Sequence, residues 1–165
     1  MSIDRLIVPM LGVRLFRDLT PRQLKMVALG AERIAFAAGE KIIREGETGD
    51  AAYLIVDGSA EIEQPATSGT AGTGVAIGAL IAEMAMLVET VHFVTVVAET
   101  DVKALVFRRE VMQDLMTRDP ELAAHFVEVI RRGLEKMAAD LHAIEATLAS
   151  ESAGDVLPLV NTASR

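Results

Sequence analysis

The chain has 165 residues and a formal net charge of −8 at pH 7. About 100–200 residues is typical of one domain, and 51% hydrophobic with 24% charged residues describes a globular chain. The absence of cysteine excludes disulfide scaffolds, thiolate metal centres and cysteine nucleophiles. The acidic balance argues against a nucleic-acid partner, because a surface that binds DNA needs clustered Lys and Arg.

The N-terminal region predicts neither a membrane span nor an export signal. Its most apolar stretch, residues 6–11, is far shorter than the ~20 apolar residues that a spanning helix needs. No small-residue cleavage site follows a long apolar run. We therefore expect a cytoplasmic protein with no membrane partner.

Residues 1–30 form a predicted N-terminal helical segment. Thr20 is a favourable N-cap, and Pro21 then occupies the first helical position, where its missing N–H costs nothing. Gly30 is the expected end of this helix.

Residues 31–107 change to short apolar runs separated by glycines, which is typical of an antiparallel sandwich or barrel. Gly46 to Asp50 and Asp57-Gly58 are expected turns, because Gly and Asp tolerate left-handed backbone conformations. The runs that we expect to form strands are Lys41–Ile43, Tyr53–Val56, Ala60–Ile62, Val75–Ile77, Val94–Ala98 and Val102–Phe107.

Residues 108–149 are predicted to be helical again, with one helix over about 108–117 and a longer one capped by Asp119 with Pro120 at its first position. Residues 150–165 are predicted to form a flexible tail. The long helix carries apolar residues at spacings that settle into a heptad seam, which predicts a homodimer interface. These seam residues are Ile130, Leu134, Met137, Leu141, Ile144 and Leu148.

The stretch from Gly39 to Gly58 resembles the strand–turn–strand signature of the cyclic nucleotide-binding domain family, which includes catabolite activator proteins and regulatory subunits of protein kinase A. It has a Gly-Glu opening, a Gly-x-x-Gly-Asp turn at residues 46–50, and Tyr53 followed by apolar residues. Residues 78–87 are similar to the family's phosphate-binding cassette, and we take the cassette-like segment as 78–95. The resemblance implies a mainly β fold, an eight-stranded antiparallel β-roll of jelly-roll type with an N-terminal helix and a long C-terminal helix.

The resemblance also implies a ligand site, and the sequence departs from it. Glu83 and Ala85 hold the sugar-contacting and amide-donating positions, whereas Ala82 stands where the family has Gly. His92 replaces the phosphate-binding Arg, and Phe93 replaces a small residue. The implied ligand-binding residues are Glu83, Met84, Ala85, His92, Phe93 and Thr95.

Catalysis has little support in the sequence, and we predict no enzyme and no metal site. The three histidines are far apart, and His125 and His142 lack the spacing of a helical metal pair. Arg131, Arg132 and Lys136 form a basic cluster, which we interpret as a solvated face or as intrahelical pairing with Glu128 and Glu135.

Three function classes follow. The first is a regulatory or sensor module that requires no cofactor and binds cyclic AMP or cyclic GMP weakly or not at all, because the phosphate-binding Arg is replaced. The second is a ligand-free module for dimerisation or for binding a protein partner. The third is a fragment of a catabolite-activator-type transcription regulator, since the 17 residues after Leu148 are too few for a helix-turn-helix domain.

Overall fold

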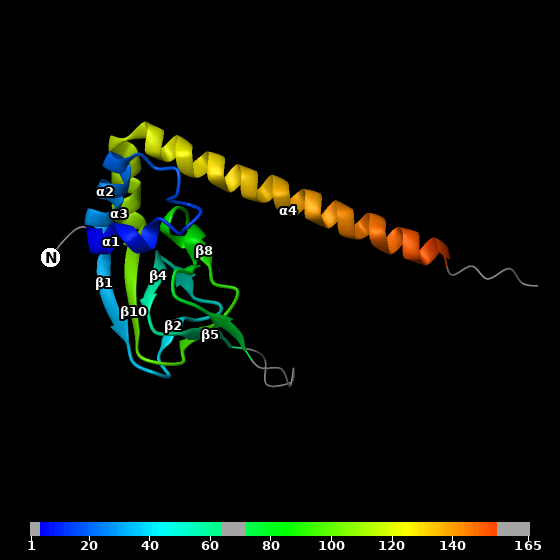
Figure 1. Ribbon diagram of the computed structural model, residues 1–165, viewed down its shortest axis with the longest axis horizontal. Coiled ribbons are helices and arrows are strands. Elements are labelled where there is room, and N and C mark those ends of the chain that lie inside the picture. The colour runs from blue at the N-terminus through cyan, green and yellow to red at the C-terminus, as the bar shows by residue number, and fades with distance from the viewer. Residues whose placement is uncertain (1–3, 64–71, 155–165) are drawn as a thin grey trace, which may run out of the picture. The chain divides into compact units, whose positions relative to one another are not determined.

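The computed structural model of the chain describes residues 4–63 and 72–154 (Figure 1). In chain order the described elements are α1 (Asp4–Met10), α2 (Pro21–Gly30), β1 (Glu32–Phe36), β2 (Lys41–Ile43), β3 (Thr48–Gly49), β4 (Ala51–Asp57), β5 (Ala60–Ile62), β6 (Thr73–Val75), β7 (Leu80–Ile81), the 3₁₀ helix η1 (Glu83–Met86), β8 (Thr90–Val91), β9 (Val96–Ala98), β10 (Val102–Arg108), α3 (Arg109–Arg118) and α4 (Pro120–Gly154).

Two antiparallel sheets form the predicted β-roll. Their strand orders are β1-β10-β4-β7 and β2-β9-β5-β6, and β3 pairs separately with β8. The mainly β fold with flanking helices is confirmed. The described residues contain ten strands where the resemblance implied eight, and three of these strands, β3, β7 and β8, have only two residues.

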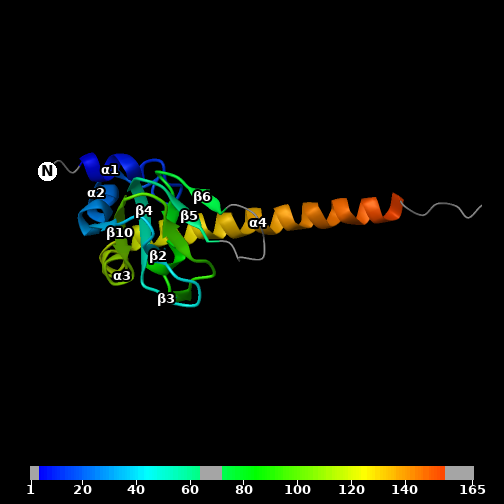
Figure 2. The ribbon, with the colours of Figure 1, turned by 90° about the horizontal axis from the view of Figure 1, so that it is seen from below.

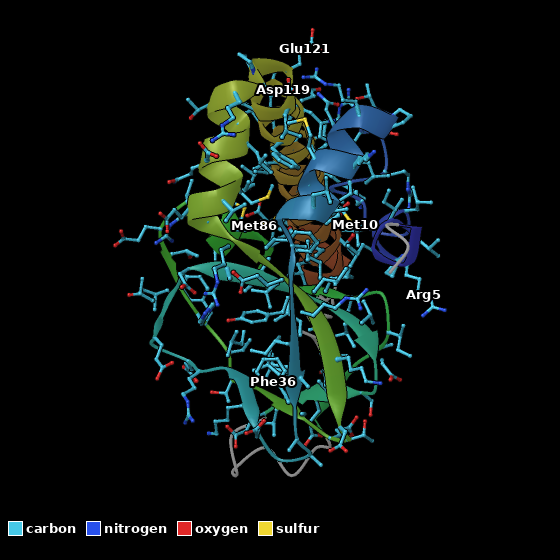
Figure 3. The ribbon with its side chains drawn as sticks, turned by 90° about the vertical axis from the view of Figure 1, so that its left-hand side faces the viewer. Arg5, Met10, Phe36, Met86, Asp119 and Glu121 are labelled. Atoms are coloured by element: carbon cyan, nitrogen blue, oxygen red, sulfur yellow. The ribbon has the colours of Figure 1, made fainter. Side chains whose placement is uncertain are left out.

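The core of the roll lies between the two sheets and consists of small and β-branched residues. Ile55, Val96 and Val102 are at most 2% exposed and belong to this cluster. Phe36 points into the interior of the roll (Figure 3), where its ring lies 6.0 Å from that of Tyr53. A chain with 4% aromatic residues therefore fills its roll mainly with aliphatic side chains.

The helices α1, α2 and α3 gather beside the β1-β10-β4 sheet (Figures 1 and 2). Alternation along β10 explains this packing, because Val102 and Ala104 face the roll interior while Phe107 belongs to a second cluster. There the ring of Phe16 lies 5.0 Å from that of Phe107 and 6.4 Å from that of Phe126. This aromatic cluster fixes β10, and with it the start of α3, against the N-terminal segment.

Both predicted helix caps are present. Thr20 forms a capping box with Gln23, so α2 begins at Pro21 and ends at Gly30 as expected. The Asp119 carboxylate accepts a hydrogen bond from the backbone N–H of Leu122 at 3.2 Å. Figure 3 shows Asp119 where α3 ends and α4 begins. Asp119 is 7% exposed, and the Gln23 side chain donates to it at 3.5 Å, which joins the two caps.

The second part of α4, from Val127 onward, forms a compact unit by itself. Glu128 binds Arg131 and Arg132, and Arg131 also pairs with Glu135, so the interpretation of the basic cluster as intrahelical pairs is confirmed. Hydrogen bonds from the two arginines hold the pKa of Glu128 at about 2.

The helix α4 continues to Gly154, whereas the sequence predicted a tail from residue 150. Residues 155–165 lie outside the described part of the chain. Within residues 4–63 and 72–154, no helix combines the length and the apolar character needed to cross a bilayer.

Candidate functional site

The cassette-like segment borders a cavity of about 590 Å³ at one side of the roll. Such a volume is within the range of small-molecule sites, ~300–1,000 Å³. Its lining residues come from β2, β5, β6, β7, η1, β8 and β9, and from the segments between β6 and η1 and between β8 and β9. Five of the six predicted ligand-binding residues are brought together here, namely Glu83, Met84, Ala85, His92 and Phe93.

The 3₁₀ helix η1 of the cassette is short, and the N–H of its residue Ala85 is already hydrogen-bonded within the protein. Ala82, just before it, has a φ of 56°, the single positive φ of a non-glycine residue in the described chain. This left-handed backbone explains why glycine suits the position in the resembled family. The N–H of Ala85 donates to the carbonyl of Ala82 at 2.9 Å, so the amide expected to bind phosphate is engaged within the protein.

Glu83 begins η1 and lines the cavity. Its Oε1 lies 3.8 Å from a guanidinium nitrogen of Arg14, whose side chain is 59% exposed. An ion pair of this length at the surface is weak. Arg14 is absent from the lining residues, so it partners Glu83 from outside the cavity.

His92 follows β8, and hydrogen bonds of its backbone N–H and carbonyl hold it in place. Its N–H donates to the carbonyl of Glu47 and its carbonyl accepts from the N–H of Gly46, both at 2.9 Å. The imidazole packs so closely on Gly49 that a Cβ built there would lie 2.5 Å from the ring. The imidazole thus covers the glycine turn while lining the cavity.

Phe93 is 84% exposed although it borders the cavity. Its ring therefore does not fill the cavity, because a ring inside the roll would be shielded from solvent. The side chain instead adds apolar surface at the rim.

Thr95 is buried at 9% exposure and is not among the lining residues. Its hydroxyl accepts a hydrogen bond from the N–H of Glu45 at 3.0 Å. The structure therefore separates Thr95 from the other five predicted ligand-binding residues and uses its hydroxyl to hold the strand–turn–strand segment.

Arg109, at the start of α3, was not singled out from the sequence. One of its guanidinium nitrogens donates to the carbonyl of Gly49 at 2.8 Å, to that of Val88 at 3.3 Å and to that of Ala85 at 3.5 Å. Its backbone N–H also donates to the carbonyl of Asp50 at 2.7 Å. Residues 46–50, expected to form a turn, include strand β3. Arg109 ties this segment to the cassette, and we call residues 44–50 with Thr95 and Arg109 the turn frame.

The charge of the cavity follows from its lining. Glu83 is its one carboxylate, His92 its one basic side chain, and no Lys or Arg of the described residues lines it. Most other lining side chains are aliphatic, including Ile43, Ile62 and Val96. Within the described residues, no three His, Cys, Asp or Glu side chains gather in a way that would hold a metal ion.

Comparison with known proteins gives matches over the same region. A sequence profile described as the cyclic nucleotide-binding domain matches residues 33–119, just over half of the chain. The cAMP-dependent protein kinase regulatory subunit of Emericella nidulans is 33% identical over 109 residues, which are 63% of this chain and 25% of that protein. The cyclic AMP receptor protein of Thermus thermophilus is 27% identical over 134 residues, which are 80% of this chain and 62% of that protein.

A solved structure shows the same fold. The N-terminal domain of a transcriptional regulator from Streptomyces coelicolor superposes with a TM-score of 0.73 at 23% identity, covering 84% of this chain and 95% of that domain. The match to the Emericella subunit spans a quarter of that protein's length, so the likeness concerns one domain of it.

Proposed function

Because the chain belongs to the cyclic nucleotide-binding domain family, we propose that it is a non-catalytic regulatory module whose cavity binds cyclic AMP or cyclic GMP weakly or not at all. The observation that carries the proposal is the lining of the cavity, in which His92 is the one basic side chain among the described residues. The names of the relatives, a kinase regulatory subunit and a receptor protein, support a regulatory role.

Loss of the phosphate partner has a large expected effect. Removing one partner of a buried charge pair costs about 2–5 kcal/mol, which moves a micromolar site towards millimolar. Histidine offers one donor direction where guanidinium offers a planar fork. The guanidinium of Arg109 does not replace the missing arginine, because it donates to backbone carbonyls of the turn frame and the cassette.

Titration calorimetry with cyclic AMP and cyclic GMP tests this proposal. The unmodified protein should show a dissociation constant in the high micromolar range or weaker. The double variant His92→Arg with Phe93→Ser should bind cyclic AMP at least about tenfold more tightly, since it restores a bidentate phosphate partner. Submicromolar binding by the unmodified protein contradicts the proposal.

A second candidate function, a homodimerisation module, is favoured by one observation on α4. Leu134, Met137, Leu141, Ile144 and Leu148 are each 56–61% exposed, whereas Ile130 is half-buried. Burial of an exposed Leu or Ile contributes about 1.5–3 kcal/mol. We propose that these six residues form a two-fold interface between copies of the chain.

Light scattering at micromolar concentration tests the dimer. We expect the mass of two chains for the unmodified protein and of one chain for Leu141→Asp with Ile144→Asp. A paired control, Arg132→Asp with Asp140→Arg, changes exposed charges on α4 and should leave the dimer intact. A monomeric unmodified protein contradicts this interface.

A further inference from the structure

The residues that line the cavity in the roll indicate which class of ligand it favours, beyond the replacement of the phosphate-binding arginine. An anion held inside a protein needs cations or free N–H donors around it, since a buried charge without partners is costly. An apolar molecule needs only a dry cavity with matching walls.

Donors for an anion are scarce at this site. The Ala85 amide is bonded to the carbonyl of Ala82, and Arg109 is occupied by three carbonyls. The 3₁₀ helix η1 has only four residues, so it provides a small dipole. Glu83 places a carboxylate on the lining, and the chain as a whole carries a charge of −8. Apart from the His92 imidazole, the described lining therefore offers little that attracts an anion, and the Glu83 carboxylate repels one.

Apolar surface is plentiful at the same site. Val75 and Ile62 are partly buried, pack against the roll core and line the cavity. At its border, Phe93 is 84% exposed and Met84 is 36% exposed. These rim side chains gain from being covered by an apolar ligand, because burial of an exposed aromatic side chain is favourable.

We propose that this cavity binds an uncharged, largely apolar small molecule in place of an anionic nucleotide. The proposal rests on the proposed function, because it names the ligand class of the same regulatory site. The aliphatic walls and Phe93 then provide the contact area for such a ligand, whereas the Glu83 carboxylate disfavours an anionic one.

A pair of dyes that differ only in charge tests the ligand class on the full chain. N-phenyl-naphthylamine is neutral, and anilinonaphthalene sulfonate carries the same rings with an added sulfonate. Fluorescence titration should show saturable binding of the neutral dye at least tenfold tighter than that of the sulfonate. The variant Glu83→Gln should tighten sulfonate binding several-fold and change neutral-dye binding less than twofold, because it removes only a repelling charge.

Variants in the cavity and on α4 show where the neutral dye binds. Val75→Phe places a ring into the cavity and should weaken neutral-dye binding at least tenfold, whereas the same substitution at Val127, which is 67% exposed on α4, should not. Leu141→Asp with Ile144→Asp should leave dye binding unchanged, which separates the cavity from the exposed seam of α4. Circular dichroism melting confirms that each variant is folded. Where Val75→Phe does not fold, Ile62→Phe replaces it.

The outcomes separate this inference from the proposed function. No saturable binding of the neutral dye, tighter binding of the sulfonate, or binding that survives the cavity-filling variants overturns the inference. Weak cyclic nucleotide binding in the same preparation leaves the proposed function standing in each of those cases. Submicromolar cyclic AMP binding that displaces the neutral dye overturns both.

Discussion

The turn frame lies against the cassette, and the two differ in how far the protein uses their polar groups. In the turn frame, Arg109 and the hydroxyl of Thr95 bind backbone groups over sequence separations of 60 and 50 residues. In the cassette, Glu83 has a single long ion pair, and Phe93 has its ring in solvent. Interactions within the protein therefore engage the polar groups of the turn frame, whereas the Glu83 and Phe93 side chains of the cassette are exposed to solvent.

This difference between the turn frame and the cassette explains how the fold can be kept when residues of the ligand site are substituted. Substitutions in the turn frame leave carbonyl or N–H groups without partners, and such losses destabilise the whole roll. A substitution of Phe93, whose ring is 84% exposed, changes the chemistry at the cavity border with little effect on packing. Substitutions in the turn frame and in the cassette should therefore differ in how much they change the free energy of unfolding.

The largest expected effect belongs to Arg109→Ala. Its guanidinium donates to the carbonyls of Gly49, Ala85 and Val88, so the variant should lower the free energy of unfolding by about 3 kcal/mol. Urea denaturation measures the change. The control Arg118→Ala removes an exposed pair with Asp114 in the same helix and should cost less than about 1 kcal/mol. Equal effects of the two variants would contradict the structural role of Arg109.

Gly49→Ala should cost about 2 kcal/mol, because small-to-large changes in packed regions force neighbours to move. An added Cβ would lie 2.7 Å from that of Ala85 and 2.5 Å from the ring of His92. Adding His92→Ala should recover only part of the loss, since the Ala85 contact remains. The control Gly74→Ala meets no atom within 4 Å and should stay within about 0.5 kcal/mol of the unmodified protein by thermal melting.

Local signals predicted much of the scaffold. Thr20-Pro21 and Asp119-Pro120 mark the starts of α2 and α4, because capping depends on neighbouring residues only. The strands Lys41–Ile43 and Ala60–Ile62 have the predicted bounds. Strand β1 was not predicted, since four of its five residues are exposed and its alternation of apolar side chains is weak.

The site was less predictable, because its geometry depends on distant contacts. Arg109 reaches Gly49 only after β10 has paired with β4, and no motif near Arg109 marks that encounter. Residues 92 and 93 were identified through the resemblance, but the exposure of Phe93 depends on where the turn after β8 points. Sequence therefore placed the side chains near one another without showing which ones face the cavity.

Thr95→Val tests whether Thr95 supports the turn frame or contacts the ligand. The variant keeps the shape but removes the acceptor for the N–H of Glu45, which should cost about 1 kcal/mol in urea denaturation. Cyclic AMP affinity in the His92→Arg with Phe93→Ser background should change less than twofold. A selective loss of affinity with unchanged stability would assign Thr95 to the ligand.

Ala82→Gly should have the smallest effect and the opposite sign. The left-handed backbone of Ala82, with φ of 56° and ψ of 40°, costs a non-glycine residue about 1–2 kcal/mol. Glycine removes that strain but loses about 0.4–1 kcal/mol through the greater freedom of the unfolded chain. We therefore expect a net gain near 0.5 kcal/mol in the free energy of unfolding. Ala85→Gly, in η1 with ordinary helical packing, serves as the matched control and should destabilise, because Ala85 is fully buried. A loss of stability in Ala82→Gly would mean that the alanine methyl, which packs against the roll core, contributes more than the strained backbone costs.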